Sequence, residues 1–166
     1  AVIMEAAKLL IDNYGRSNIH FLICGNRPGE EKVFIDQLQG FKAFEHVTFA
    51  GYRTDLDKIM PDCHIGVIAS TGWDSFPMSS LEMAACGLPM VVSRLQGLVE
   101  TIEENATGLL FEPGNHEEMA AHILQLVDDT HMHSQFSQRA RQRILEKFDK
   151  QHQKANLLTA MRSKIQ

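Results

Sequence analysis

Short, continuously apolar runs are the main pattern in this chain. Five runs rich in Val, Ile, Phe and Leu are spaced along it, and most of them lack a regular alternation with polar residues. Such runs are typical of strands that are buried on both faces of a parallel sheet. They predict strands over residues 19–24, 47–50, 65–69, 89–93 and 108–111.

Helix-like stretches lie between these apolar runs, and their expected spans are 1–13, 28–39, 54–61, 79–86 and 98–104. Strands that alternate with helices predict a doubly wound α/β layer with right-handed crossovers. The fold class that we expect is therefore a Rossmann-like parallel sheet with helices on both faces.

Residues that begin or end helices support this assignment. Two pairs of polar residues are spaced as capping boxes, a glycine stands where a helix should stop, and an asparagine precedes the helix expected over 116–129. In chain order these are Thr54 with Asp57, Ser79 with Glu82, Gly87, and Asn115. After residue 130 only helices are expected, so residues 1–166 form one domain that ends in C-terminal helices over 131–166.

Composition and charge exclude several classes of protein. The chain has 166 residues and a formal charge of −5, which argues against a general nucleic-acid binder, and no apolar run is long enough to predict a transmembrane segment. The charge is uneven, −11 over residues 1–138 and +6 over residues 139–164. We interpret the basic segment as a solvated helical face, with contact to anionic lipid or to an acidic partner as the alternative. Three cysteines without a C-x-x-C pair indicate reduced thiols and a cytoplasmic protein.

Three loops at the carboxyl ends of the expected strands are candidates for ligand binding, because ligands of open parallel sheets bind at that edge. They are 25–29 (GNRPG), 51–53 (GYR) and 70–76 (STGWDSF). The first lacks the G-x-G-x-x-G spacing, so we interpret it as a simple turn. In the third, Asp74 precedes a helix and Glu82 follows in its first turn. These two carboxylates would accept hydrogen bonds from sugar hydroxyls while the helix N-terminus holds phosphate.

A longer motif gives the third loop a family context. The chain reads D-S-F-P from Asp74 to Pro77 and L-E-M-A-A-C-G-L-P from Leu81 to Pro89. This resembles the E-x7-E hallmark of the C-terminal domain of GT-B-fold retaining glycosyltransferases, family four (group 1). Weaker similarities at 47–51, 97–102 and 107–111 extend the resemblance over nearly the whole chain.

The resemblance implies the transfer of a sugar from a nucleotide-diphosphate donor with retained anomeric configuration, without a metal or another cofactor. It implies that Glu82 holds the ribose hydroxyls of the donor and that Asp74 is the catalytic carboxylate facing the sugar. The other donor-binding residues that it implies are Met78 and Ser79 at the diphosphate, Ser75, Phe76 and Pro77 in the turn beside it, and Gly51, Tyr52 and Arg53 around the base.

The chain departs from the family pattern in two ways. Asp74 replaces the usual glutamate, so its side chain is one methylene shorter. The Arg and Lys that the family places on the diphosphate, the first strand and the N-terminal acceptor domain are all expected to precede Ala1. We therefore expect the isolated chain to be inactive. The resemblance also implies a lipid-linked or polysaccharide acceptor, and a cytoplasmic enzyme that lies peripherally at the membrane.

Other interpretations remain open from the sequence alone. Glu82 would serve equally as the capping partner of Ser79, and Asp74 as a solvated loop acid. Asp55 and Asp57 have the D-x-D form of metal-dependent glycosyltransferases, but their place at a helix start favours a helix cap. The alternative functions are another nucleotide-sugar enzyme on this scaffold, such as an epimerase or a sugar-phosphate synthase, and a non-catalytic α/β interaction module.

Overall fold

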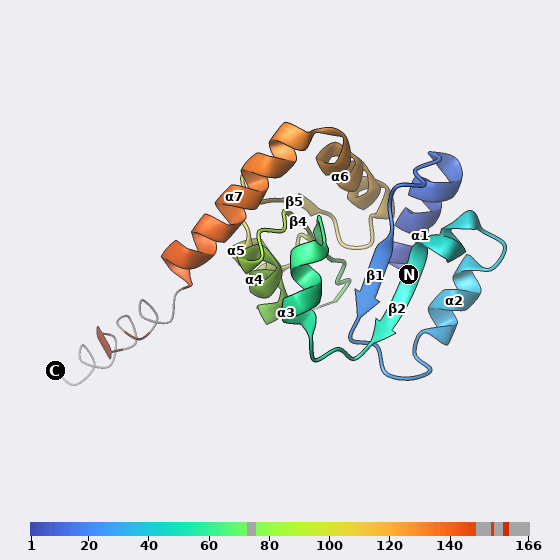
Figure 1. Ribbon diagram of the computed structural model, residues 1–166, viewed down its shortest axis with the longest axis horizontal. Coiled ribbons are helices and arrows are strands. Elements are labelled where there is room, and N and C mark those ends of the chain that lie inside the picture. The colour runs from blue at the N-terminus through green and yellow to red at the C-terminus, as the bar shows by residue number, and fades with distance from the viewer. Residues whose placement is uncertain (73–75, 149–153, 155–157, 160–166) are drawn as a thin grey trace.

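The computed structural model describes residues 1–72, 76–148, 154, 158 and 159. Within these residues the expected fold class is confirmed, because every strand pairing is parallel and helices cover the sheets (Figure 1). The structure contains no helix that is both long and apolar enough to cross a membrane among the residues described.

The described strands lie close to the five apolar runs and form two parallel sheets. They are β1 (Phe21–Cys24), β2 (Val47–Gly51), β3 (Gly66–Ile68), β4 (Met90–Ser93) and β5 (Gly108–Phe111). One sheet pairs β1 with β2, and the other has the order β3-β4-β5. In the first sheet Phe21 lies opposite Val47, and a register shift after Ile23 places Cys24 opposite Gly51.

The described helices follow the expected stretches, and most of them are shorter than expected. They are α1 (Val2–Lys8), which continues as a π-helical turn η1 (Leu9–Asn13), α2 (Lys32–Leu38), η2 (Lys42–His46), α3 (Leu56–Ile59), η3 (Met60–Asp62), α4 (Met78–Ala85), α5 (Gln96–Thr101), α6 (His116–Asp128) and α7 (Thr130–Lys147).

Alternate residues of the central strand β4 face two different hydrophobic cores. Val91 belongs to a core that contains side chains of α1 and α6, whereas Met90 and Val92 pack with α5 and with Met83 of α4. Because side chains alternate between the two faces of a strand, α1 and α6 cover one face of this sheet, and α4 and α5 cover the other. The sheet therefore has helices on both faces.

The two sheets share a core although they are not paired with each other. Side chains of β1 and β3, such as Phe21 and Val67, belong to the same hydrophobic cluster. No ladder joins these two strands in the part of the chain that the structure describes. The residues of β4 and β5 are all buried, whereas β1 and β3 are only partly buried, so the edges of β1 and β3 are less protected than the centre of the second sheet.

The helix signals read from the sequence have mixed outcomes. Asn115 caps α6 as expected, since its side-chain oxygen accepts a hydrogen bond from the Glu118 amide at 3.1 Å. Gly87 follows α4 with a φ of 82°, which is the conformation expected of a helix stop. The capping box at Thr54 is wrong, because α3 begins one residue later than a cap at Thr54 requires, with Asp55 in the N-cap position and no side-chain cap.

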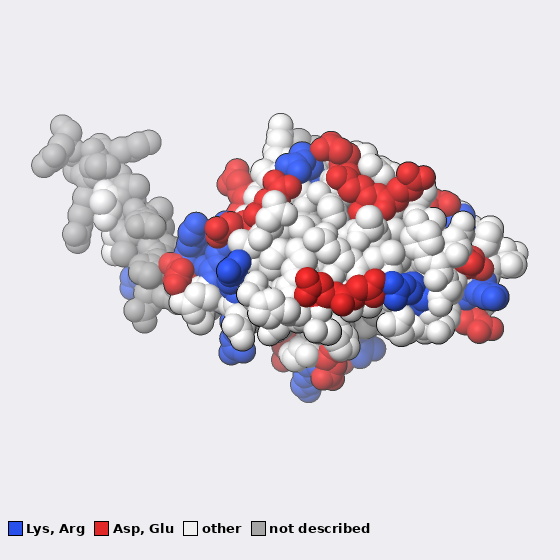
Figure 2. Space-filling view, turned by 90° about the horizontal axis from the view of Figure 1, so that it is seen from above, with Lys and Arg blue, Asp and Glu red and all other residues white. Residues whose placement is uncertain are grey.

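Helix α7 accounts for the first part of the C-terminal helices expected over 131–166, and most of residues 149–166 lie outside the described residues. Its basic residues are Arg139, Arg141, Arg143 and Lys147. Figure 2 shows a group of Lys and Arg side chains at the end of the molecule where α7 lies, several Asp and Glu side chains over the middle of this face, and further Lys and Arg side chains at the opposite end. The basic residues that are concentrated in the C-terminal part of the sequence therefore also lie together on the surface.

Candidate functional site

The N-terminus of α4 follows the carboxyl end of β3 and carries no side-chain cap. The helix begins at Met78, and Pro77 precedes it with an extended backbone. Ser79 therefore lies inside the helix, and the capping box expected from Ser79 and Glu82 is wrong. Proline fixes its own φ and has no side-chain acceptor, so Pro77 cannot cap the first amides of α4. The amide of Ser80 donates to the Pro77 carbonyl at 3.1 Å, and among the described residues no group accepts from the Met78 and Ser79 amides.

Glu82 lies one helical turn after Met78, on the exposed face of α4. Met78 is 61% exposed and Glu82 is also exposed, whereas Ser80, Leu81 and Ala84 are buried. Among the described residues no hydrogen bond or ion pair engages the Glu82 carboxylate. This carboxylate is therefore not a capping partner of Ser79, and it is accessible to a ligand placed along the start of α4.

The loop over 25–31 is more than the simple turn expected from its sequence. The Glu31 carboxylate accepts hydrogen bonds from the Gly29 amide at 2.9 Å and from the Asn26 side-chain amide at 3.1 Å. The backbone amides of Glu31 itself and of Gly29 are among the donors that hold the pKa of Glu31 below its ordinary value. The loop is thus closed around a carboxylate that stays ionised at neutral pH.

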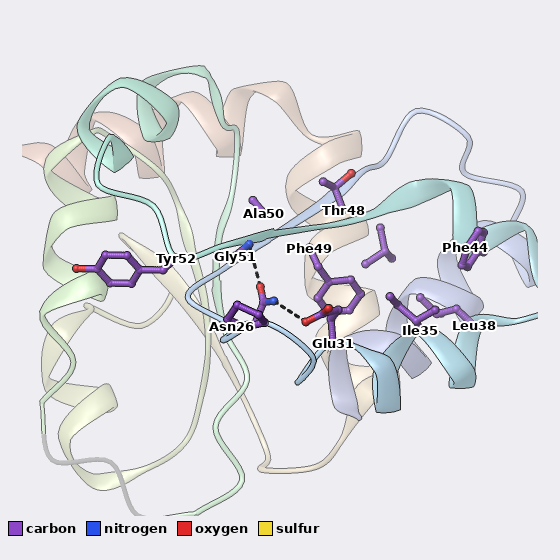
Figure 3. Close-up of a pocket in the computed structure, with 12 residues that line it drawn as sticks. Asn26, Glu31, Ile35, Leu38, Phe44, Thr48, Phe49, Ala50, Gly51 and Tyr52 are labelled. Carbon is purple, nitrogen blue, oxygen red and sulfur yellow. Dashed lines mark hydrogen bonds between the residues drawn. The ribbon is translucent and has the colours of Figure 1, made fainter.

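Asn26 also joins this loop to the loop that follows β2. Its side-chain oxygen accepts a hydrogen bond from the Gly51 amide at 3.0 Å, as Figure 3 shows, and the Gly25 amide donates to the Gly51 carbonyl at 2.8 Å. Gly51 has a φ of 66°, a conformation that favours glycine. Gly51, the first of the expected base-lining residues, is therefore held in place by the loop that follows β1.

Of the two other expected base-lining residues, Tyr52 is exposed and Arg53 is held in an ion pair. Tyr52 is 80% exposed, and its ring extends away from the groove drawn in Figure 3. Arg53 instead forms a bidentate ion pair with Asp55, at 2.8 Å from Nε and 2.6 Å from Nη2. Hydrogen bonding to Asp55 raises the pKa of Arg53, and the same contact lowers the pKa of Asp55. Asp55, the first acid of the D-x-D sequence at the start of α3, thus binds an arginine side chain.

A groove of about 710 Å³ runs along the outer side of β2 (Figure 3). Its apolar walls come from α2, η2 and β2, and Asn26, Glu31 and Thr48 add polar atoms. The groove shares Gly51 and Tyr52 with the expected base loop, but neither Met78 nor Glu82 lines it. The groove and the start of α4 are therefore two separate places on the molecule.

The turn before α4 is described from Phe76 onward. Asp74 and Ser75, which we expect at the sugar and beside the diphosphate, lie outside the described residues, as does Trp73. Phe76 and Pro77 are partly buried and lead directly into Met78. Among the described residues no group of three His, Cys, Asp or Glu side chains is arranged to hold a metal ion.

Contacts between distant parts of the chain at this site were missed from the sequence. Asn26 and Gly51 are 25 residues apart, and no local pattern in either loop signals that they are bonded. The buried hydroxyls of Ser80 and Thr101, 21 residues apart, are joined by a 2.7 Å hydrogen bond. The only available signal was indirect: both loops after β1 and β2 are rich in residues that favour turns, and parallel strands bring their ends to one edge.

Comparison with known proteins shows which family the chain resembles. The family model described as glycosyl transferases group 1 matches residues 1–143. The chain is 28% identical over 127 residues to N-acetyl-alpha-D-glucosaminyl L-malate synthase of Bacillus anthracis, which covers 76% of this chain and 33% of that protein.

A second relative and a solved structure agree with this match. The chain is 32% identical over 142 residues to N,N'-diacetylbacillosaminyl-diphospho-undecaprenol alpha-1,3-N-acetylgalactosaminyltransferase of Campylobacter jejuni, covering 86% of this chain and 35% of that protein. A mutant of TarM from S. aureus, solved with fondaparinux, alpha-GlcNAc-glycerol and UDP, superposes with a TM-score of 0.83 at 26% identity, over 95% of this chain and 31% of that one.

This chain spans about one third of the length of each of these three proteins. The match to the family model nevertheless extends over most of the chain, from α1 through most of α7. The chain therefore belongs to the group 1 glycosyl transferases.

Proposed function

We propose that this chain is the donor-binding domain of a retaining, metal-independent glycosyltransferase, and that it binds a nucleotide-diphosphate sugar at the start of α4. The observation that carries this proposal is the combination of an uncapped α4 N-terminus and an exposed Glu82 carboxylate that no described residue engages. Both follow the carboxyl end of β3, at the edge of the sheet where ligands of such folds bind.

The diphosphate would lie against the amides of Met78 and Ser79, which no described residue engages. A helix N-terminus presents N–H donors and a partial positive charge, which together attract phosphate without a metal. The same donors would stabilise the charge that develops on the departing nucleoside diphosphate during transfer. The uncapped start after Pro77 supports this role, because no side chain of the described residues competes for these amides.

The nucleoside would span the two rims that follow β2 and β3. We assign Glu82 to the ribose hydroxyls, which an ionised carboxylate binds through charge-assisted hydrogen bonds. We assign Gly51, Tyr52 and Arg53 to the base, supported by the fixed backbone at Gly51 and the exposed ring of Tyr52. A ring that is 80% exposed can stack on a planar base.

The proposal also covers the transferred sugar and the acceptor. Asp74 would face the transferred sugar as the catalytic carboxylate, with Ser75, Phe76 and Pro77 in the turn that presents it. The acceptor, a lipid-linked or polysaccharide chain, would bind to an N-terminal domain in the full-length enzyme, and the isolated chain would be inactive. The basic residues of α7 support a peripheral contact of that enzyme with anionic lipid on the cytoplasmic side.

A titration of the isotope-labelled chain with UDP, GDP and ADP tests the proposal. We expect one of these nucleotides to shift the amide signals of residues 51–53 and 78–82 together, while the signals of α6 stay in place as an internal control. Transfer by the full-length enzyme with retained configuration, followed on the anomeric proton of the product, would extend the test to the reaction. Unchanged signals at millimolar concentrations of all three nucleotides would refute the donor site.

A further inference from the structure

Phe148, the residue directly after α7, contacts the turn that leads into α4. The ring of Phe148 lies 6.0 Å from the ring of Phe76, with an angle of 47° between their planes. The guanidinium of Arg143, on α7, lies over the ring of Phe148, with its Cζ 5.1 Å from the ring centre. The ring of Phe148 is therefore in contact with a cation on α7 and with the aromatic ring that precedes the start of α4.

Arg143 also fixes α7 to the end of α5. Its Nη2 donates to the carbonyl oxygen of Glu100 at 2.9 Å and to that of Ile102 at 3.4 Å. Carbonyl groups at the end of a helix have no partner within the helix, so a cation there satisfies them. Nε and Nη1 of Arg143 are buried and have no hydrogen-bond partner in the part of the chain that the structure describes. Its two hydrogen bonds to the end of α5 and its contact with Phe148 therefore fix where this guanidinium lies.

Helix α5 is also joined to α4, so that α4, α5 and α7 are all connected to one another. The Ser80 hydroxyl donates to Thr101 at 2.7 Å, and both residues are fully buried. At the other end of α4, a Cβ added to Gly87 would lie 3.2 Å from the Ser137 hydroxyl on α7, so the two helices also approach closely there. Figure 1 shows α7 passing beside α4 and α5. The start of α4 is thus held from α5 on one side and from α7, through the Phe76 turn, on the other.

We propose that Phe148 and Arg143 are positioning residues for the donor site, which hold the turn of Phe76 and Pro77 so that the amides of Met78 and Ser79 point at the diphosphate. The proposal rests on the function proposed above. Neither residue touches the donor. Phe148 acts on the turn through its ring, and Arg143 acts through Phe148 and the end of α5. A merely structural role would require only that Phe148 fill apolar space between α7 and the domain.

The variant Phe148→Leu separates these two roles, because leucine keeps the apolar contact and removes the ring. We expect it to unfold within a few degrees of the wild-type chain, to shift the ligand-free amide signals of Met78 and Ser79, and to weaken binding of UDP. An aromatic pair contributes beyond its buried area by an amount that corresponds to a loss of about threefold to tenfold in affinity. Phe148→Tyr should restore both readouts, because it keeps the ring.

Two further variants complete the test. Leu145→Ala is the matched control, since Leu145 lies on the same helix and is 60% exposed, and it should change neither the Met78 signal nor the affinity. Arg143→Met, which keeps an unbranched apolar side chain but removes the guanidinium, should act like Phe148→Leu, and Arg143→Lys should retain part of the wild-type behaviour. In the full-length enzyme, the loss should fall on kcat as well as KM, because the same amides stabilise the leaving diphosphate.

Two outcomes would overturn the inference. If Phe148→Leu leaves the Met78 and Ser79 amides unchanged in the ligand-free chain, α7 does not position the start of α4. If those signals shift but the affinity for UDP equals that of the wild type, the contact has no role in donor binding. A wild-type chain that binds no nucleoside diphosphate would instead refute the proposed function, and this is read from the wild type before any variant is compared.

Discussion

The buried pair Ser80 and Thr101 gives the sharpest stability prediction, because it joins α4 to α5 below the proposed donor site. The Ser80 hydroxyl donates to Thr101 Oγ1 at 2.7 Å, and the Thr101 hydroxyl donates in turn to the Leu98 carbonyl, also at 2.7 Å. Both residues are at most 1% exposed, so water cannot replace a lost partner. A chain of two short hydrogen bonds in a dry site makes the cost of each substitution depend on the other residue.

The magnitudes follow from which groups lose a partner. Thr101→Val keeps the shape of the side chain but leaves the Ser80 hydroxyl without an acceptor, at a cost of about 1–3 kcal/mol in the free energy of unfolding. Ser80→Ala removes one bond while Thr101 still donates to Leu98, at a cost of ~0.5–1.5 kcal/mol. In the double variant no Ser80 hydroxyl is left unpaired. The loss of unfolding free energy in the double variant should therefore be smaller than the sum of the losses in the two single variants, by about 1 kcal/mol.

Urea unfolding of the chain, followed by far-ultraviolet circular dichroism, measures this coupling if the slope m is the same in all four proteins. In thermal unfolding, ~1 kcal/mol corresponds to about 2–4 °C for a domain of this size. The matched control pairs Ser80→Ala with Thr107→Val. Thr107 is equally buried but bonds within its own turn, at Glu103, and these two costs should simply add. Additive costs for Ser80→Ala and Thr101→Val would refute the link between α4 and α5.

Two further predictions concern the sheet and the first loop. A Cβ on Gly108 would lie 2.5 Å from the backbone oxygen of Met90, whereas a Cβ on Gly66 would meet the flexible end of the Met90 side chain. In the same urea assay, Gly108→Ala should therefore lower the free energy of unfolding by about 3 kcal/mol, and Gly66→Ala by less than half of that. Equal losses would contradict this packing. Because the Glu31 amide and the Gly29 amide hold the pKa of Glu31 below its ordinary value of 4.5, the closed loop is stabilised above that pH and loses this stabilisation as the pH falls below it. The amide signal of Gly29 should therefore move in acid with a midpoint below pH 4.5, and a midpoint above that value would show that the carboxylate is not held as described.

The sequence predicted those parts of the fold that depend on local patterns. Continuous apolar runs located all five described strands, and the final run coincides with β5. Gly87 and Asn115 were correctly placed because each acts on its own helix end. The pairing of the strands into two separate sheets could not be predicted in the same way, since it depends on contacts between segments that are far apart in the chain.

The two errors at helix starts have different local causes. Thr54 and Ser79 both have the residue type of a cap, but the conformation of the preceding residues decides where a helix begins. At α4 the proline at position 77 sets the boundary, and at α3 the carboxylate next to Thr54 is engaged by Arg53 instead. For the candidate site, the motif predicted donor-binding residues at the start of α4, and their roles stay predictions. The contacts that hold them, such as Phe76 with Phe148, join residues too distant for any local pattern to reveal.

The central claim is that Glu82 holds the ribose of a nucleoside diphosphate at the start of α4. The most direct measurement compares the affinities of UDP and 2′,3′-dideoxy-UDP for the wild-type chain and for Glu82→Gln by calorimetry, with Glu117→Gln on α6 as the control. Charge-assisted hydrogen bonds to the ribose hydroxyls predict that the wild type and the control prefer UDP by about tenfold or more, and that Glu82→Gln loses most of this preference. An equal preference in all three proteins would contradict the account.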